Sequence, residues 1–111
     1  GSTGYSLSCN GPVISPDSKS LVITPIAPHN LGARPMVISE DTEIKLNVDS
    51  REEEFLISLD SRITSVSENT SISIRKAPFT IKTIIPRNNS FLKTLRTKLL
   101  WGEDTRNETN L

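Results

Sequence analysis

Apolar and polar residues alternate with a period of two along the middle of the chain. Ile44, Leu46 and Val48 alternate with polar neighbours, and so do Ile72 and Ile74. This period gives a strand one buried and one solvated face. Turn residues recur at intervals of about eight to twelve, as in antiparallel sheets. The pattern predicts strands at 21–26, 36–39, 43–48, 55–59, 62–66, 71–76 and 79–84. Pro25 has no N–H, so the first strand should lie at an edge or end there.

Helical signals lie at both ends of this region. Residues 3–9 are mostly small and polar, and the run Asn10-Gly11-Pro12 can stop a helix, since Asn and Gly tolerate a left-handed conformation. Further on, Ser90 can cap a helix with Gly102 as its stop. Its apolar residues recur at helical spacing, at 91, 92, 95, 99 and 100. This second helix either packs on the domain or recognises a partner.

The predicted fold class is therefore mainly β. We expect an antiparallel, multi-stranded, sandwich-like domain with a short N-terminal helix and a C-terminal helix. The 111 residues are enough for one small domain. Residues 1–106 should form this domain, and 107–111 should form a polar tail.

Composition limits the possible functions. Lys plus Arg and Asp plus Glu number 13 each, which argues against a nucleic-acid-binding surface. Apolar residues make up only 34%, below the roughly 45–50% of ordinary domains, so part of the burial should come from a missing segment or from another subunit. The one Cys excludes an internal disulfide and fits a reducing compartment. No apolar run approaches the roughly 18 residues of a membrane span.

Few residues are candidates for chemistry. Residues 1–8 form either a flexible start or a ligand-binding segment rich in hydroxyl groups. His29, in a Pro-rich loop, is either a bystander or a ligand contact, and a lone His excludes a His/Cys zinc cluster. Asp60 is either a turn former or a substrate contact, and Arg34 either grips an anion or pins its loop. Two classes remain: the substrate-binding half of an enzyme and a non-catalytic β interaction module.

Several runs, taken in order, resemble the successive motifs of the NAD kinase family. Their spacing along the chain is similar to that of the family from about residue 1 to about residue 106. The runs are Gly1-Ser2-Thr3-Gly4-Tyr5-Ser6-Leu7-Ser8, Asn10-Gly11-Pro12, Thr24-Pro25-Ile26-Ala27-Pro28-His29, Arg34-Pro35-Met36-Val37-Ile38, Ser58-Leu59-Asp60-Ser61, Phe91-Leu92-Lys93-Thr94-Leu95-Arg96 and Lys98-Leu99-Leu100-Trp101-Gly102.

The resemblance implies the C-terminal NAD-binding β domain of a phosphotransferase. Such an enzyme phosphorylates the adenosine-ribose 2′-hydroxyl of NAD to form NADP, using ATP or inorganic polyphosphate and a divalent metal such as Mg²⁺. The family's catalytic Gly-Gly-Asp-Gly-Thr motif belongs to its N-terminal domain. We therefore expect no catalytic residue and no metal ligand in this chain, which should be inactive alone.

Carried over by position, the family's NAD contacts fall on three segments. The nicotinamide side falls on Thr3, Gly4, Tyr5 and Ser8; the following loop contributes Ala27 and His29; Asp60 and Ser61 match a position near the phosphorylated end. The expected ligands are NAD, NADP and ATP. The resemblance also implies a homo-oligomer, either a dimer or a tetramer, in the cytoplasm. We expect no binding to nucleic acid or to a membrane.

Three features depart from the family pattern, and two other readings stay open. Gly4 stands where Ala is common, and Cys9-Asn10 replaces small residues. Ser61 stands where Gly or His is common, so that any His contact to the 2′-phosphate is lost or replaced by a hydroxyl. The alternatives are the β domain of a related lipid or diacylglycerol kinase and the non-catalytic β module.

Overall fold

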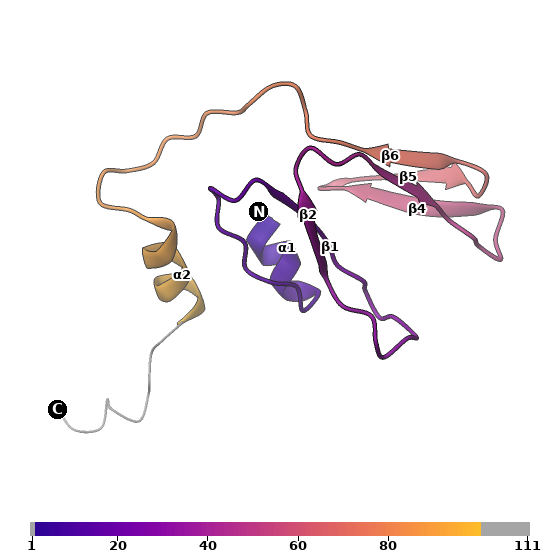
Figure 1. Cartoon of the computed structure of the whole chain (residues 1–111), viewed down its shortest axis with the longest axis horizontal. Coiled ribbons are helices and arrows are strands. Elements are labelled where there is room, and N and C mark those ends of the chain that lie inside the picture. Colours follow the sequence, from indigo (N-terminus) through magenta and orange to yellow (C-terminus); the bar gives the residue numbers. More distant parts are fainter. Residues whose placement is uncertain (1, 101–111) are drawn as a thin grey trace. The chain divides into compact units, whose positions relative to one another are not determined.

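A computed structural model describes residues 2–100 of the chain (Figure 1). Its Cα positions fall into two compact units. The first unit holds the described parts of 1–18, 24–33 and 79–111, with helices α1 (Ser2–Ser8) and α2 (Phe91–Leu99). The second unit holds 19–23 and 34–78, with strands β1 (Ser20–Ile23), β2 (Met36–Ser39), β3 (Ile44–Asn47), β4 (Glu54–Leu59), β5 (Arg62–Ser67) and β6 (Ser71–Ile74).

The strands form three two-stranded antiparallel sheets. β1 pairs with β2, β3 with β6, and β4 with β5. The β4–β5 hairpin is thus inserted in the sequence between the two strands of the β3–β6 pair. The prediction of a mainly β, antiparallel fold with a helix near each end is confirmed.

The alternating pattern sets the register of the β3–β6 pair. Ile44 lies opposite Ile74, and Leu46 lies opposite Ile72, so the four apolar side chains share one face. The other face carries the polar pairs, among them Lys45 opposite Ser73. A shift of one residue would move the whole apolar set to the other face, which is why the pattern specifies this register.

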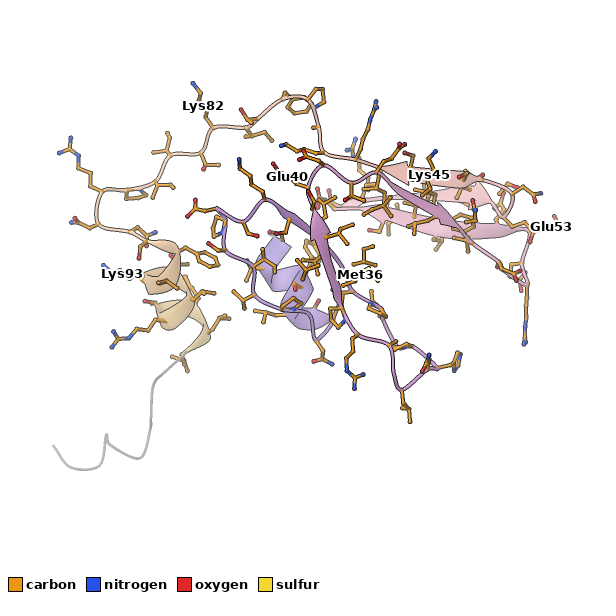
Figure 2. All side chains as sticks on the ribbon, in the orientation of Figure 1. Met36, Glu40, Lys45, Glu53, Lys82 and Lys93 are labelled. Carbon is orange, nitrogen blue, oxygen red and sulfur yellow. The ribbon has the colours of Figure 1, made fainter. Side chains whose placement is uncertain are left out.

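Three strands are shorter than predicted, and one predicted strand is absent. β3 covers only Ile44–Asn47 of the predicted 43–48. β1 ends at Ile23, before Pro25, and β6 ends at Ile74. The strand predicted at 79–84 is wrong, because no strand in the described part of the chain pairs with that segment. Phe79 and Ile81 alternate with polar residues but are 69% and 81% exposed. Lys82 lies in the same extended segment, between β6 and α2 (Figure 2). Alternation without a hydrogen-bonding neighbour is not enough to make a strand.

The helix α2 has the predicted start but a different end. The Ser90 side chain accepts a hydrogen bond from the Lys93 amide at 3.2 Å, as an N-cap does. The helix stops at Leu99, with Leu100 left-handed at φ 53°. The predicted stop, Gly102, lies outside the described residues.

Burial is sparse across residues 2–100. Leu95 of α2, 5% exposed, is the one buried apolar side chain among them, whereas Leu92 on the same helix is 71% exposed. Other large apolar side chains are also open to solvent, such as Ile84 at 98%. This agrees with the lean composition. The expectation that a missing segment or another subunit supplies part of the burial stays a prediction.

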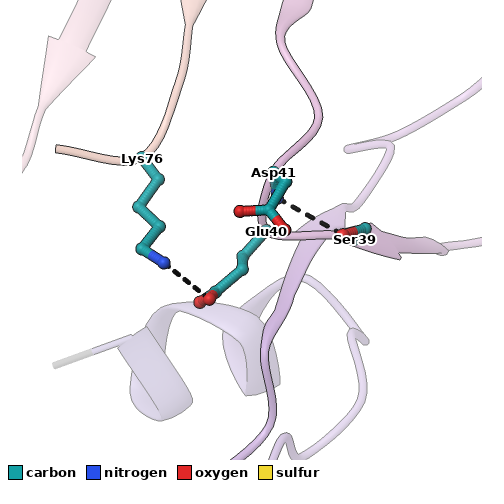
Figure 3. A network of polar contacts seen from close by, with 4 residues as sticks. All are labelled: Ser39, Glu40, Asp41 and Lys76. Atoms are coloured by element: carbon teal, nitrogen blue, oxygen red, sulfur yellow. Dashed lines mark hydrogen bonds and ion pairs between the residues drawn. The ribbon is translucent and has the colours of Figure 1, made fainter. Parts of the chain in front are cut away.

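An ion pair joins the segments that follow β2 and β6 (Figure 3). The Lys76 ammonium lies 2.6 Å from a Glu40 carboxylate oxygen. The Glu40 amide also donates to the Lys19 carbonyl, next to β1. The hydrogen bond to Glu40 raises the pKa of Lys76 above its ordinary 10.5, and the nearby charge of Asp41 acts in the same direction. The pair therefore connects the β1–β2 sheet to the β3–β6 sheet within the second unit.

Truncation of Leu95 should destabilise the protein far more than truncation of Leu92. In the full-length protein, Leu95→Ala should lower the free energy of unfolding by about 2–4 kcal/mol, because it removes a buried side chain. Leu92→Ala should lower it by less, because the Leu92 side chain is 71% exposed within residues 2–100. Urea unfolding of both variants measures the difference; equal losses would contradict the burial pattern.

The pKa of Lys76 should depend on Glu40. Glu40→Gln removes the charged acceptor, so the Lys76 pKa should fall toward 10.5, as an NMR titration of its side chain would measure. Because the folded-state pKa is raised, the pair's contribution to stability is complete below pH 10.5 and is lost as the pH rises through the raised value. Glu43→Gln is the control, since that carboxylate accepts from Ser73 instead, at 2.6 Å.

Candidate functional site

Four of the predicted NAD contacts lie on α1. At 100° per residue, Gly4, Tyr5 and Ser8 share one face of this helix, and all three are exposed, Tyr5 at 61%. Thr3 and Ser6 are half-buried on the other side. The structure thus gathers three of the four residues on one open face and turns Thr3 away from it.

The hydroxyl of Ser8 is oriented by its own helix. Its Oγ donates a hydrogen bond to the Tyr5 carbonyl at 2.7 Å. The proton is therefore engaged, and the oxygen lone pairs remain to accept from a ligand. Beside the Tyr5 ring, this face offers a hydrogen-bond acceptor and a flat aromatic surface, which suits a planar amide with N–H donors.

The end of α1 is a Schellman motif. Asn10 is left-handed with φ 57°, the Gly11 amide donates to the Ser6 carbonyl at 2.7 Å, and the Asn10 amide donates to the Leu7 carbonyl at 3.1 Å. This confirms the predicted helix stop, with Asn10 as the left-handed residue. The chain leaves α1 in one defined direction as a result.

Gly11 is the most crowded glycine of the described chain. A Cβ there would lie 2.5 Å from Ser6 Oγ, 2.9 Å from the Ser6 carbonyl oxygen and 3.1 Å from Thr24 Oγ1. The absence of a side chain lets the helix end approach Thr24, where the loop bearing the next two predicted contacts begins. Gly4, by contrast, has no atom within 4 Å of such a Cβ.

The loop after Thr24 carries Ala27 and His29. Ala27 is left-handed at φ 48°, and both side chains are exposed. Immediately beyond, the Asn30 side chain accepts from the Gly32 amide at 2.8 Å, which makes a local turn. The loop belongs to the same compact unit as α1.

Asp60 and Ser61 form the two-residue turn between β4 and β5. Asp60 is left-handed at φ 53°, and its carbonyl accepts from Ser58 Oγ at 3.2 Å. Asp60 is therefore a turn former, one of the two roles that we expected for it. These two residues lie in the second unit and are grouped separately from α1.

Residues 2–100, the part of the chain that the structure describes, bear on a possible metal site and on a possible membrane span. They contain no group of three or more His, Cys, Asp or Glu side chains that could hold a metal ion. Within the same range, no helix has the length and apolar character needed to cross a bilayer.

The fold and site define a mainly β domain with an exposed hydroxyl-bearing helix face, locked at its end by an Asn-Gly turn. The chain belongs to the ATP-NAD kinase C-terminal domain family, which it matches over residues 1–85. It is 63% identical over 107 residues to an NAD kinase of Flavobacterium johnsoniae and 64% identical to one of Christiangramia forsetii. Both matches cover 96% of this chain and 36% of the relative. An NAD kinase of Bacteroides fragilis is 49% identical over 106 residues, which are 96% of this chain and 37% of that protein.

The chain therefore spans a little over a third of the length of these relatives. The resemblance in the motifs is confirmed at the level of the family. The roles of the eight predicted contact residues stay predictions.

Alanine at the two glycines of this region should have opposite effects. Gly11→Ala should lower the free energy of unfolding of the full-length protein by more than about 1 kcal/mol, since its Cβ meets backbone as well as side chain. Gly4→Ala should be neutral or stabilising by up to about 1 kcal/mol, because Ala favours a helix over Gly and finds open space. Urea unfolding tests both, and a tolerated Gly11→Ala would contradict the packing.

Proposed function

We propose that this chain is the NAD-binding part of an NAD kinase that phosphorylates the adenosine-ribose 2′-hydroxyl of NAD to give NADP. The observation that carries the proposal is the family match over residues 1–85 together with 63% identity to an NAD kinase. The exposed face of α1 supplies the chemistry that a nicotinamide needs. No feature of the described residues favours a lipid substrate or a non-catalytic role over this one.

In this proposal, α1 holds the nicotinamide end. Tyr5 offers its ring to the planar nicotinamide, and Ser8 Oγ, which already donates to the Tyr5 carbonyl, accepts from the carboxamide N–H₂ group. Gly4 has no side chain, so the ligand can approach the helix backbone at this position. Thr3 contributes from the half-buried side, through its backbone.

The other predicted contacts lie outside α1, on the loop after Thr24 and on the β4–β5 turn. Ala27 and His29 contact NAD from the loop that begins beside Gly11. Asp60 and Ser61 lie near the end that is phosphorylated, and the Ser61 hydroxyl takes the place of a His or Gly found in relatives. The left-handed turn at Asp60 fixes the direction in which these two polar side chains leave the hairpin.

The phosphoryl donor, ATP or polyphosphate, and the Mg²⁺ bind elsewhere in the full-length enzyme. When bound, the metal neutralises charge on the donor phosphates. The described residues form no cluster that fits it, so we assign it to none of them. Because the family's catalytic Gly-Gly-Asp-Gly-Thr motif belongs to its N-terminal domain, we propose that this chain is inactive alone. The full enzyme is a homo-oligomer located in the cytoplasm. The many exposed apolar side chains support the oligomeric part of this proposal.

Replacement of Tyr5 or Ser8 should weaken NAD binding in the full-length enzyme. Tyr5→Ala should raise KM for NAD about tenfold or more, and Ser8→Ala about threefold to tenfold, as expected for the loss of an aromatic contact and of one hydrogen bond. Tyr5→Phe should keep most of the affinity, because the ring remains. NADP formation, assayed with ATP and with polyphosphate as donors, measures these values.

Thr97→Ala is the matched control, since it removes a hydroxyl from an exposed position of α2. It should leave KM for NAD unchanged. The proposal fails if the parent enzyme makes no NADP with either donor. The assignment of α1 fails if Tyr5→Ala and Ser8→Ala both bind NAD as the parent does.

A further inference from the structure

Ser6 is not among the predicted NAD contacts, but it makes more contacts to the end of α1 than any of them. Its Oγ donates to the Pro12 carbonyl at 2.6 Å, six residues ahead. Its own carbonyl accepts from the Gly11 amide at 2.7 Å and from the Cys9 amide at 3.2 Å. Ser6 thus contacts the chain after the helix through both its side chain and its backbone.

The hydroxyl bond of Ser6 is unusual for a helical serine. Such a hydroxyl commonly bonds backward, to a carbonyl three or four residues earlier in the helix. Here it bonds forward, across the Schellman turn, and so holds the segment at Pro12 against the helix. Ser6 is half-buried, and the hydrogen bond is partly shielded from water, which strengthens it relative to an exposed one.

Ser6 lies next to the residues that form the exposed face of α1, Tyr5 and Ser8. Tyr5 precedes Ser6 directly, and Ser8 follows two residues later, so the orientation of both depends on how the short helix is anchored. A helix of this length has little stability of its own in water. Its anchors are therefore the contacts at its end, and Ser6 supplies several of them.

Thr24 relates the turn at the end of α1 to the loop that carries the predicted contacts Ala27 and His29. Its Oγ1 lies 3.1 Å from the place where a Cβ of Gly11 would stand. The loop that starts at Thr24 leads to Ala27 and His29, in the same compact unit. The turn at residues 10–12 thus lies between α1 and the start of that loop.

We infer that Ser6 is a positioning residue for NAD recognition: its hydroxyl bond to the Pro12 carbonyl fixes the angle at which α1 presents Tyr5 and Ser8. This inference rests on the proposed function, since it assigns Ser6 a role in that same site. Ser6 does not contact the substrate. It acts through Tyr5 and Ser8, and its loss should affect the binding of NAD and not the binding of the donor.

The test uses the full-length enzyme with Ser6→Ala, Ser6→Thr and Ser6→Cys. Ser6→Ala should raise KM for NAD about threefold to tenfold, while KM for ATP and kcat stay within about twofold of the parent, as for a loss of uniform substrate binding. Ser6→Thr retains the hydroxyl and should restore most of the affinity. Ser6→Cys keeps the shape with a weak donor and should fall between Ala and the parent. Ser15→Ala, an exposed serine of the same unit, is the control and should behave as the parent.

A double-mutant cycle separates positioning from general stability. If Ser6 acts through the exposed face, Ser6→Ala should raise KM for NAD by less than twofold in a Tyr5→Ala, Ser8→Ala background. A merely structural role would instead lower the fraction of active enzyme, which reduces apparent kcat without changing KM. An unchanged KM in Ser6→Ala, or an undiminished increase in the double-variant background, would overturn the inference. The parent must form NADP in the same assay; if it does not, the proposed function has failed and not the role of Ser6 alone.

Discussion

The amide of Gly11 reaches back five residues to the Ser6 carbonyl, and this hydrogen bond ends α1. The seven-residue helix is too short to be stable in isolation, so its geometry derives from this closure. Asn10 accepts the left-handed conformation that the turn requires, and Gly11 leaves room for Ser6 and Thr24. If the turn changed, Tyr5 and Ser8 would still be on one face, but that face would point elsewhere.

The second unit has few buried apolar contacts that could stabilise its sheets. Its three sheets have two strands each, and an isolated two-stranded sheet is only marginally stable in water. The apolar face of the β3–β6 pair includes Ile74, still 42% exposed, and the Glu40–Lys76 pair is partly solvated. A surface ion pair contributes little to stability. The described residues thus bury little apolar surface among themselves, in a chain that spans about a third of its relatives' length.

The sequence predicts the local structure well where one residue decides it. Asn10 takes the left-handed conformation that was predicted for Asn10 or Gly11, β1 ends before Pro25, and Ser90 caps α2. It fails at 79–84, where the pattern is right for a strand but the neighbour that would pair with it is not in the described chain. Long-range pairing is a property of two segments, and the alternation of one segment carries no information about the other.

The role of Ser6 was beyond sequence reasoning for a related reason. A serine in a run of hydroxyl residues has no distinguishing pattern, and its forward bond to Pro12 exists only once the turn has formed. The closest signal is the Gly-Pro pair five and six residues later.

Residues 1–16 contain no Asp, Glu, Lys, Arg or His, so the proposed nicotinamide face selects its ligand by shape and neutral hydrogen bonds. Such bonds depend on distance and angle more steeply than attraction between charges does. A site of this kind therefore relies on the rigidity of its support, and here the support is the bonded turn between Ser6 and Pro12.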